Sequence, residues 1–360
     1  MNNTRLVVSK IQCMSKQTSI LIIYTGGTIG MVADEKTGSY HPFDMDVLFS
    51  HVPELSRLKL NLETVSFEEP IDSSDFDVST WIKLATIIED AYNDHDGFVV
   101  LNGTDTMAYT ASAMSFMLEN LAKPVIITGS QLPMGVLRTD GKENLISAIE
   151  IAAARKEGKP RVQEVAIYFG SKLLRGNRAQ KFNTEGFEAF DSFNYPPLAD
   201  VGIHIIYHDL RMLRQAQMEF AISTAMDDNV GVLRLFPGMK KNIFEQILNT
   251  PDLKGLVLET FGSGNATSAN WFVEALKKAT DNGLIVVNVT QCGRGFVEQG
   301  KYLTSRGLIS CGVISAADMT VEAAITKMMK LLGLGYRGSE FEMEFTRSSR
   351  GELTSYSTLS

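Results

Sequence analysis

Two short segments rich in threonine and glycine, each directly after an apolar run, are the strongest candidates for chemistry in this sequence of 360 residues. The first is Thr25-Gly-Gly-Thr28, after "SILIIY" (19–24), and the second is Gly103-Thr-Asp-Thr106, after "GFVVLN" (97–102). A threonine hydroxyl can act as a nucleophile when a base lies within hydrogen-bond reach. Each segment by itself also fits a plain turn or a helix cap.

A glycine-rich nucleotide loop is the competing interpretation of the first segment. The dinucleotide fingerprint Gly-x-Gly-x-x-Gly requires a glycine where this chain has Thr25, counting back from Gly27 and Gly30. It also requires a helix next, whereas "MVADEKTGSYHPFD" (31–44) has the composition of a loop. The nucleotide interpretation therefore fails, which leaves a plain turn or a loop that presents Thr28.

Two further polar segments have the side chains that a small charged substrate needs. Asp72, Ser73 and Ser74 precede a helix expected from Ser79, so they either hold a zwitterion or cap that helix. Lys181 lies in a loop rich in Gly, Asn and Arg, where a solvated lysine is the ordinary outcome. A catalytic lysine would need burial or cationic neighbours that lower its pKa.

Alternating strands and helices must position these segments. Runs rich in Val and Ile, apolar nearly throughout, predict strands covered on both faces and hence a largely parallel sheet. The expected strands are 19–24, 97–102, 124–129, 164–169, 230–236, 254–260 and 284–289. The expected helices are 79–94, 106–121, 141–159, 268–283 and 320–335. This is the α/β pattern, in which ligands bind beyond the carboxyl ends of the strands.

The length favours two domains, and the alternation weakens between 194 and 228. We expect a flexible lead-in at 1–18, an N-terminal catalytic domain at 19–205, a linker at 206–228 and a C-terminal domain at 229–360. Met14 is a candidate for the true start, since the regular pattern begins just after it.

Composition excludes several classes of protein. The net charge of −8, from 34 basic and 42 acidic residues, disfavours a nucleic-acid or anionic-membrane partner. Three cysteines predict no disulfide framework and a reducing, cytoplasmic compartment. His204 and His208 stand in a strand-like run and are read as structural, and Cys292 lacks an evident histidine partner, so we expect no metal site and no thiol catalysis.

Taken in order, six segments resemble one family. They are "YTGGTIGM", "DSSD", "LNGTDTMAYTASAMSFMLEN", "PVIITGSQLP", "RGNRAQK" and "TQC". From about Ile20 to Thr354, the chain is similar to the bacterial-type L-asparaginases of the cytosolic type I branch. The resemblance implies a larger N-terminal domain with a mostly parallel sheet and flanking helices, and a smaller C-terminal α/β domain.

The resemblance also assigns roles to particular residues. Thr28 matches the nucleophile and Tyr40 the tyrosine of a mobile flap at 31–42, whose Gly38 suits a closing lid. The second catalytic set matches Thr104, Asp105 and Lys181. Apart from the resemblance, N–H groups at a helix start near Thr104 would suit an oxyanion. The positions that match substrate-binding residues are Asp72, Ser73, Ser74, Ser130 and, from a neighbouring subunit, Asn265.

The implied activity is hydrolysis of L-asparagine to L-aspartate and ammonia through a threonine acyl-enzyme, without metal or organic cofactor. The implied assembly is a homotetramer built from dimers. Ser74 departs from the glutamine of periplasmic relatives, so the contacts to the amino group must differ. Glu259 replaces an arginine that some cytosolic relatives use for a second asparagine, which weakens the case for an effector site at Glu259, Thr290, Gln291 and Cys292.

Three other functions compete with this one. An amidase subunit of a tRNA-dependent amidotransferase would need an extra N-terminal domain, and the lead-in is short. A non-catalytic amino-acid sensor would not need all five residues that match the catalytic set, which are Thr28, Tyr40, Thr104, Asp105 and Lys181. An NAD-dependent enzyme would need the fingerprint that is missing here.

Overall fold

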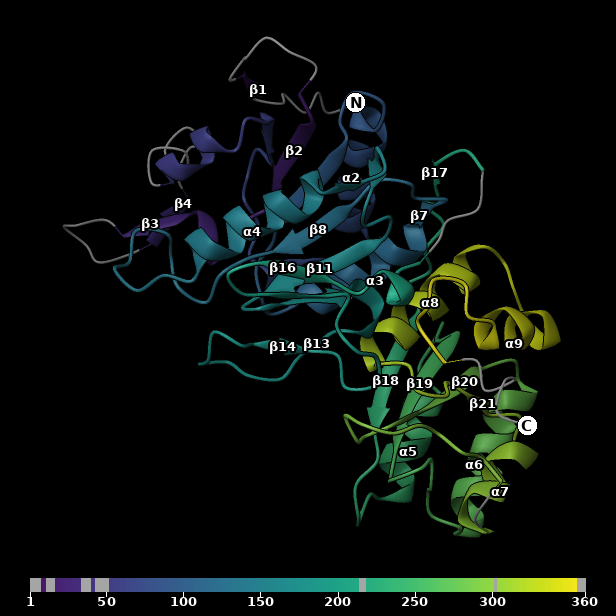
Figure 1. Cartoon of the computed structure of the whole chain (residues 1–360). Coiled ribbons are helices and arrows are strands. Elements are labelled where there is room, and N and C mark those ends of the chain that lie inside the picture. The colour runs from purple at the N-terminus through teal and green to yellow at the C-terminus, as the bar shows by residue number, and fades with distance from the viewer. Residues whose placement is uncertain are drawn as a thin grey trace. The chain divides into compact units, whose positions relative to one another are not determined.

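The computed structural model describes residues 8–10, 17–33, 40–42, 52–213, 218–300 and 303–354, and for 8–10, 32–33, 40–42 and 303–304 only the backbone is considered (Figure 1). The described chain forms two compact units that divide between Ser223 and Thr224. Each unit has its own sheet and its own core, so each is treated separately. Most of the predicted lead-in, and Gly38 of the predicted flap, lie outside the described residues.

The first unit is built on a nine-stranded sheet whose centre is parallel. Across the sheet the strands are β1 (Val8–Lys10), β5 (Asn61–Ser66), β2 (Ser19–Tyr24), β6 (Gly97–Leu101), β8 (Val125–Thr128), β11 (Val165–Phe169), β12 (Lys172–Arg175), β15 (Ala199–Val201) and β16 (Ile205–Tyr207). Strands β5, β2, β6, β8 and β11 pair in parallel, and the remaining pairs are antiparallel. The predicted α/β class with a largely parallel central sheet is confirmed.

Both faces of this sheet are covered, as the apolar runs predict. Along β2, Ile20 and Ile22 pack into a core with Leu145 and Ala148 of helix α4 (Gly141–Ala153). The other face carries α3 (Met107–Met117), which contacts β8 and β11 and packs beside α2 (Val78–Ala91). Because every residue of β6 is buried, this strand lies at the centre of the layered unit.

Two of the predicted helices are shorter than expected. Helix α4 ends at Ala153, and the chain then forms the antiparallel pair β9 (Arg155–Lys156) and β10 (Lys159–Pro160). Glu157 and Gly158 both have positive φ there, which makes a tight hairpin and not another helical turn. Helix α3 gives way to β7 (Leu118–Glu119), which pairs with β17 (Ala221–Ile222).

Two short pairs of strands lie near the predicted chemistry. The first is β3 (Met31–Ala33) with β4 (Tyr40–Pro42), directly after Thr28, and the second is β13 (Gln180–Lys181) with β14 (Phe190–Asp191). The segment after Thr28 is thus a short 3-10 turn, Thr28–Gly30, followed by a strand and not by the helix of a nucleotide-binding loop.

The second unit has a four-stranded parallel sheet in the order β18 (Val230–Arg234), β19 (Gly255–Thr260), β20 (Ile285–Thr290) and β21 (Ile314–Ser315). One face packs against α5 (Lys241–Leu248), α6 (Asn270–Asp281) and α7 (Leu303–Ser310). The other face packs against α8 (Val321–Gly333) and α9 (Gly338–Thr346) (Figure 1). The predicted smaller C-terminal α/β domain is confirmed. Among the described residues, no helix combines the length and apolarity needed to cross a bilayer.

Candidate active site

The segments with the two threonine motifs follow neighbouring strands. Strand β2 lies between β5 and β6. After β2 the chain therefore adds β5 on one flank of β2 and then adds β6 on the other flank. Such a reversal opens a crevice at the carboxyl ends of the strands, where open α/β sheets bind ligands. Thr25, after β2, donates its N–H to Leu101 O of β6 at 3.1 Å, and Ile71 N–H donates to Thr25 O at 2.9 Å. Three loops are therefore joined by backbone hydrogen bonds at this point.

Glycines allow these loops to come into direct contact. A Cβ placed on Gly27, whose φ is 91°, would lie 2.5 Å from the Cα of Gly103. A Cβ placed on Gly103 would lie 2.6 Å from Ser73 Oγ. These spaces are too small for any side chain, so backbone packs against backbone. The contact places half-buried Thr28, the residue after Gly27, beside the segment that contains Thr104 and Asp105.

Lys181 joins the side chains of that second segment. Its Nζ donates to Thr104 Oγ1 at 2.8 Å and to Asp105 Oδ1 at 2.6 Å. The Lys181 side chain is 14% exposed, whereas that of Asp105 is 66% exposed. The structure therefore brings these three predicted residues together. The Lys181 ammonium makes a charge-assisted hydrogen bond to the Asp105 carboxylate and a second hydrogen bond to the Thr104 hydroxyl.

A buried ion pair anchors the loop that leads to Lys181. Arg175, at the end of β12, donates to the carboxylate of Glu164 at 2.7 Å, and both side chains are buried. Burial opposes the charge on Arg175, but the adjacent carboxylate outweighs it and raises the pKa of Arg175 above its usual value. The chain then enters a buried 3-10 turn, Gly176–Arg178, which lies against α3 and leads into β13.

Gln131 is a contact of Thr104 that the sequence analysis missed. Thr104 Oγ1 lies 3.4 Å from Gln131 Oε1, and Gln131 Nε2 donates to Gly186 O at 3.2 Å. Because a carbonyl only accepts, the Gln131 amide nitrogen faces Gly186 and its oxygen faces the Thr104 hydroxyl. One indication of Gln131 was available in the sequence: it directly follows Ser130, a predicted site residue, just after a buried strand. Ser130 itself is buried, and its hydroxyl donates to Leu132 O at 2.6 Å.

The helix after β6 begins after Thr104 and Asp105, not at Thr104. Helix α3 starts at Met107 with Thr106 as its N-cap, so Thr104 and Asp105 precede the helix. The helix start thus agrees with the predicted 106 to within one residue, but it does not lie at Thr104, and the oxyanion role of N–H groups in this segment stays a prediction. Residues 104–106 instead form a bend, in which Thr106 donates to Ser73 O and Thr104 accepts from Lys181, and the helix begins only after these contacts.

The Asp72–Asp75 segment forms a capped turn. Asp72 accepts the Ser74 N–H at 2.9 Å and caps the 3-10 turn Ser73–Asp75, whereas the cap of the following helix α2 is Asp77. Asp72 and Ser74 nevertheless remain exposed, whereas Ser73 is buried against Gly103. Tyr40 belongs to β4, opposite Ala33 of β3, and its side chain lies outside the described residues.

The remaining predicted residues belong to the second unit. Asn265 bridges to Phe261 in the loop after β19. Glu259 pairs with Arg234 at 3.3 Å, across two parallel strands.

The residues after β20 also contact their own unit. Thr290 Oγ1 donates to Gly262 O, and Gln291 Nε2 donates to Leu235 O at 2.7 Å. Cys292 is exposed with a free thiol. Strands β18 to β21 lie in chain order, so among the described strands this sheet has no reversal of order like that at β2.

The histidines singled out earlier lie at one edge of the first sheet. His208 Nε2 lies 2.7 Å from Asp200 Oδ2, and His204 is exposed. Within the described ranges, His, Cys, Asp and Glu side chains form no group of three or more suited to a metal ion.

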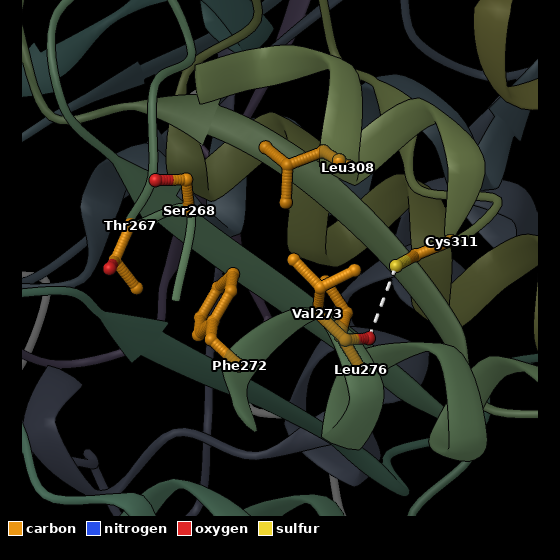
Figure 2. Close-up of a pocket in the computed structure, with 8 residues that line it drawn as sticks. Thr267, Ser268, Phe272, Val273, Leu276, Leu308 and Cys311 are labelled. Atoms are coloured by element: carbon orange, nitrogen blue, oxygen red, sulfur yellow. Dashed lines mark hydrogen bonds between the residues drawn. The ribbon is translucent and has the colours of Figure 1, made fainter. Parts of the chain in front are cut away.

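A cavity of about 120 Å³ lies in the second unit, where α6 faces α7 (Figure 2). Phe272, Leu276 and Leu308 line it, and the Cys311 thiol contacts Val273 O at 3.4 Å. Burial raises the pKa of Cys311, which keeps the thiol protonated and unreactive. The lining also has the hydroxyls of Thr267 and Ser268, but no lysine, histidine or carboxylate accompanies them, so the sheet edge in the first unit is the better candidate.

Comparison with known proteins agrees with this geometry. The chain matches the families described as "Asparaginase, N-terminal" over residues 19–212 and "Glutaminase/Asparaginase C-terminal domain" over 229–345. L-asparaginase 1 of Escherichia coli (strain K12) is 41% identical, over 94% of this chain and 99% of that protein. One component of the glutamyl-tRNA(Gln) amidotransferase of Pyrococcus abyssi is 31% identical, over 94% of this chain and 77% of that protein.

A solved structure gives the same answer. L-asparaginase I from Vibrio cholerae superposes with a TM-score of 0.85 at 38% identity, over 94% of this chain and 99% of that one. The expected resemblance is confirmed, and this chain belongs to the asparaginase family.

Proposed function

We propose that this protein is an L-asparaginase that hydrolyses L-asparagine to L-aspartate and ammonia, with Thr28 as the nucleophile. The observation that supports it best is the Lys181 ammonium, hydrogen-bonded to Thr104 and Asp105. The glycine contact beside it places the Thr28 loop at the same sheet edge.

In the acylation step, Thr28 Oγ attacks the carbon of the side-chain amide. The carbon–nitrogen bond breaks, the nitrogen leaves as ammonia, and an aspartyl ester forms on Thr28. Tyr40 is proposed to accept the hydroxyl proton and to return it to the leaving nitrogen. Dividing amide hydrolysis in this way replaces one high barrier with two lower ones.

In the deacylation step, water attacks the ester carbon, L-aspartate leaves, and Thr28 recovers its proton. Thr104 and Lys181 are proposed to orient this water and to move its proton. Lys181 is well placed, since it already contacts a hydroxyl and a carboxylate through short hydrogen bonds. General acid–base assistance of this kind contributes about 10²–10⁴-fold to the rate.

Substrate binding is proposed to use the exposed turn beside Gly103. The Asp72 carboxylate would hold the α-ammonium group, and Ser73 and Ser74 the α-carboxylate. The Ser130 carbonyl would accept from the side-chain amide. Support comes from the position of this turn, which is hydrogen-bonded and packed against both threonine segments.

We further propose a cytoplasmic homotetramer in which Asn265 of one subunit completes the site of its neighbour. The tetramer and the shared site rest on the resemblance to the type I branch. The cytoplasmic location rests on the low cysteine content. Ammonia release should then be lost when the protein is diluted to monomers. A monomer with full activity would contradict the shared site.

Ammonia release from asparagine and glutamine, measured for wild type, Thr28→Ala and Thr104→Val, tests the assignment. We expect asparaginase activity in the wild type and a loss of at least about a thousandfold in Thr28→Ala. Thermal unfolding should show that both variants remain folded. Full activity of folded Thr28→Ala would refute the nucleophile.

The amidotransferase relative suggests a second candidate, an amidase that passes ammonia to a partner protein. That function predicts little ammonia release from free asparagine by the isolated chain. A high rate without any partner would therefore exclude it.

A further inference from the structure

Thr106 occupies the N-cap of α3, yet its hydroxyl serves another segment. Among the described residues of this helix start, no N–H is capped by the Thr106 side chain. A threonine at this position usually accepts a hydrogen bond from the first helical turn. Here Thr106 Oγ1 donates instead to Ser73 O at 2.7 Å, across 33 positions of the chain.

Ser73 is held on two sides by the same segment. Its carbonyl accepts from the Thr106 hydroxyl and from Phe76 N–H at 3.2 Å, which occupies both lone pairs. Its side chain packs against Gly103, where an added Cβ would lie 2.8 Å from Ser73 Cβ. Ser73 is only 2% exposed, and these two contacts fix the position of the turn.

This hydrogen bond links the two groups of residues in the proposed site. Ser73 lies between exposed Asp72 and Ser74, and Thr106 follows Asp105 and Thr104 by one and two positions. Planar peptide units limit how far residues one or two positions apart can move independently. The hydrogen bond from Thr106 to Ser73 therefore constrains the distance between the Asp72–Ser74 turn and the residues Thr104 and Asp105.

We propose that Thr106 is a positioning residue for substrate binding. Its hydroxyl fixes the Asp72–Ser74 turn at the distance that lets one small zwitterion contact the turn and the reacting groups together. The inference rests on the proposed asparaginase function and adds a residue outside the catalytic set. If the Asp72–Ser74 turn is misplaced, the affinity for the substrate should fall more than kcat, since Thr28, Thr104 and Lys181 keep their own contacts.

Two substitutions at Thr106 separate the hydroxyl from the side-chain volume. Thr106→Val keeps the shape and removes the donor, and Thr106→Ser keeps the donor. Thr110→Val is the matched control, since Thr110 lies in the same helix, is fully buried and accepts from Trp81 Nε1 at 3.2 Å. The readouts are kcat and KM for asparagine, the calorimetric Kd for L-aspartate, and thermal unfolding.

We expect Thr106→Val to raise both KM and the aspartate Kd by roughly tenfold, the effect of one lost hydrogen bond, with a smaller change in kcat. Thr106→Ser should restore both constants. Thr110→Val should lower the unfolding temperature and leave KM and Kd unchanged. If Thr106→Val is not recovered folded, Thr106→Ala takes its place, because it fits within the space of threonine.

Wild-type KM and Kd in folded Thr106→Val, or equal changes in Thr106→Val and Thr110→Val, would overturn the inference alone. A wild type that neither releases ammonia from asparagine nor binds aspartate would overturn the proposed function, and the positioning role with it.

Discussion

Lys181 and Lys327 both pair with carboxylates, in very different surroundings. Lys181 donates to Thr104 and to Asp105, whose side chain is 66% exposed at the edge of the first sheet. Lys327 on α8 is 3% exposed, and its partner Glu352 is fully buried. The first pair is open to a ligand, whereas the second lies within the protein.

The partners of Lys327 show what the buried pair does. Its ammonium donates to Phe345 O at 2.8 Å, to Arg347 O at 2.6 Å and to the Glu352 carboxylate. All three N–H donors of a lysine are thereby used within the second unit. Glu352 also accepts the Arg350 N–H at 2.7 Å. The pair thus fastens the C-terminal segment to α8, which is a structural role.

The comparison shows that ion-pair chemistry alone does not identify a site. Lys181 pairs with a hydroxyl and with a carboxylate that faces solvent, so a substrate or water can share its hydrogen bonds. Lys327 has backbone carbonyls in those places. What distinguishes Lys181 is its position at the carboxyl edge of the sheet, beside the reversal of strand order at β2.

The largest effect should come from Lys181→Met, which removes the ammonium and keeps the length of the side chain. We expect kcat to fall by about 10²–10⁴-fold, the range for a lost acid–base group, measured as ammonia release. The unfolding temperature should change little, because Asp105 is 66% exposed and stays solvated without its partner, so that the pair contributes only about 1 kcal/mol. Lys172→Met is the control, since Lys172 also pairs with a carboxylate, Asp191 at 3.4 Å. Equal losses in both variants would contradict a specific role for Lys181.

Lys327→Met should have the opposite profile. Removing one partner of a buried pair leaves the Glu352 charge uncompensated, so the free energy of unfolding should fall by about 3–5 kcal/mol in urea titrations. The activity of the molecules that stay folded should remain at the wild-type level. The double variant Lys327→Met/Glu352→Leu should recover most of the stability. A single variant as stable as the wild type would remove the distinction between the two lysines.

The smallest effect concerns acid stability. Burial alone would raise the pKa of Glu352, but Lys327 and nearby N–H donors outweigh it and hold the pKa below its ordinary value. The unfolded chain then binds more protons than the folded one below about pH 4.3, the ordinary pKa of a glutamate. The free energy of unfolding should therefore fall as the pH drops from that value toward the folded pKa.

Comparing wild type with Glu352→Gln isolates the contribution of Glu352 to the pH dependence of unfolding, because the other carboxylates titrate alike in both proteins. The difference in unfolding free energy between them, followed from about pH 5 downward, should shrink as the pH falls. A difference that does not depend on pH would contradict the pKa assignment.

The strands that frame the site were predictable because burial on both faces leaves an unbroken apolar run. Strands β2 and β6 are such runs, and each is followed by a threonine-glycine segment. The antiparallel strands β12 and β15 escaped prediction because they are short and have no such run, whereas β16 falls within the run from His204 to His208 that was read as strand-like. The helix prediction past Ala153 failed because helical periodicity does not register a two-residue hairpin turn.

The resemblance supplied candidate residues for the site, but it did not supply their contacts. Nothing in the sequence distinguishes Lys181 from a surface lysine, or Lys327 from the solvent side of α8. Those differences arise from partners 76 and 25 positions away along the chain. Gln131 and Thr106 were missed for the same reason, since each acts through a tertiary hydrogen bond.

The most direct test of the central claim is to look for the ester on Thr28. Intact mass spectrometry of Lys181→Met, quenched during incubation with asparagine, should show a fraction carrying one aspartyl group. Peptide mapping should place that group on Thr28, and Thr28→Ala/Lys181→Met should lack it. An aspartyl group on another residue, or ammonia release at the wild-type rate from folded Thr28→Ala, would contradict the account.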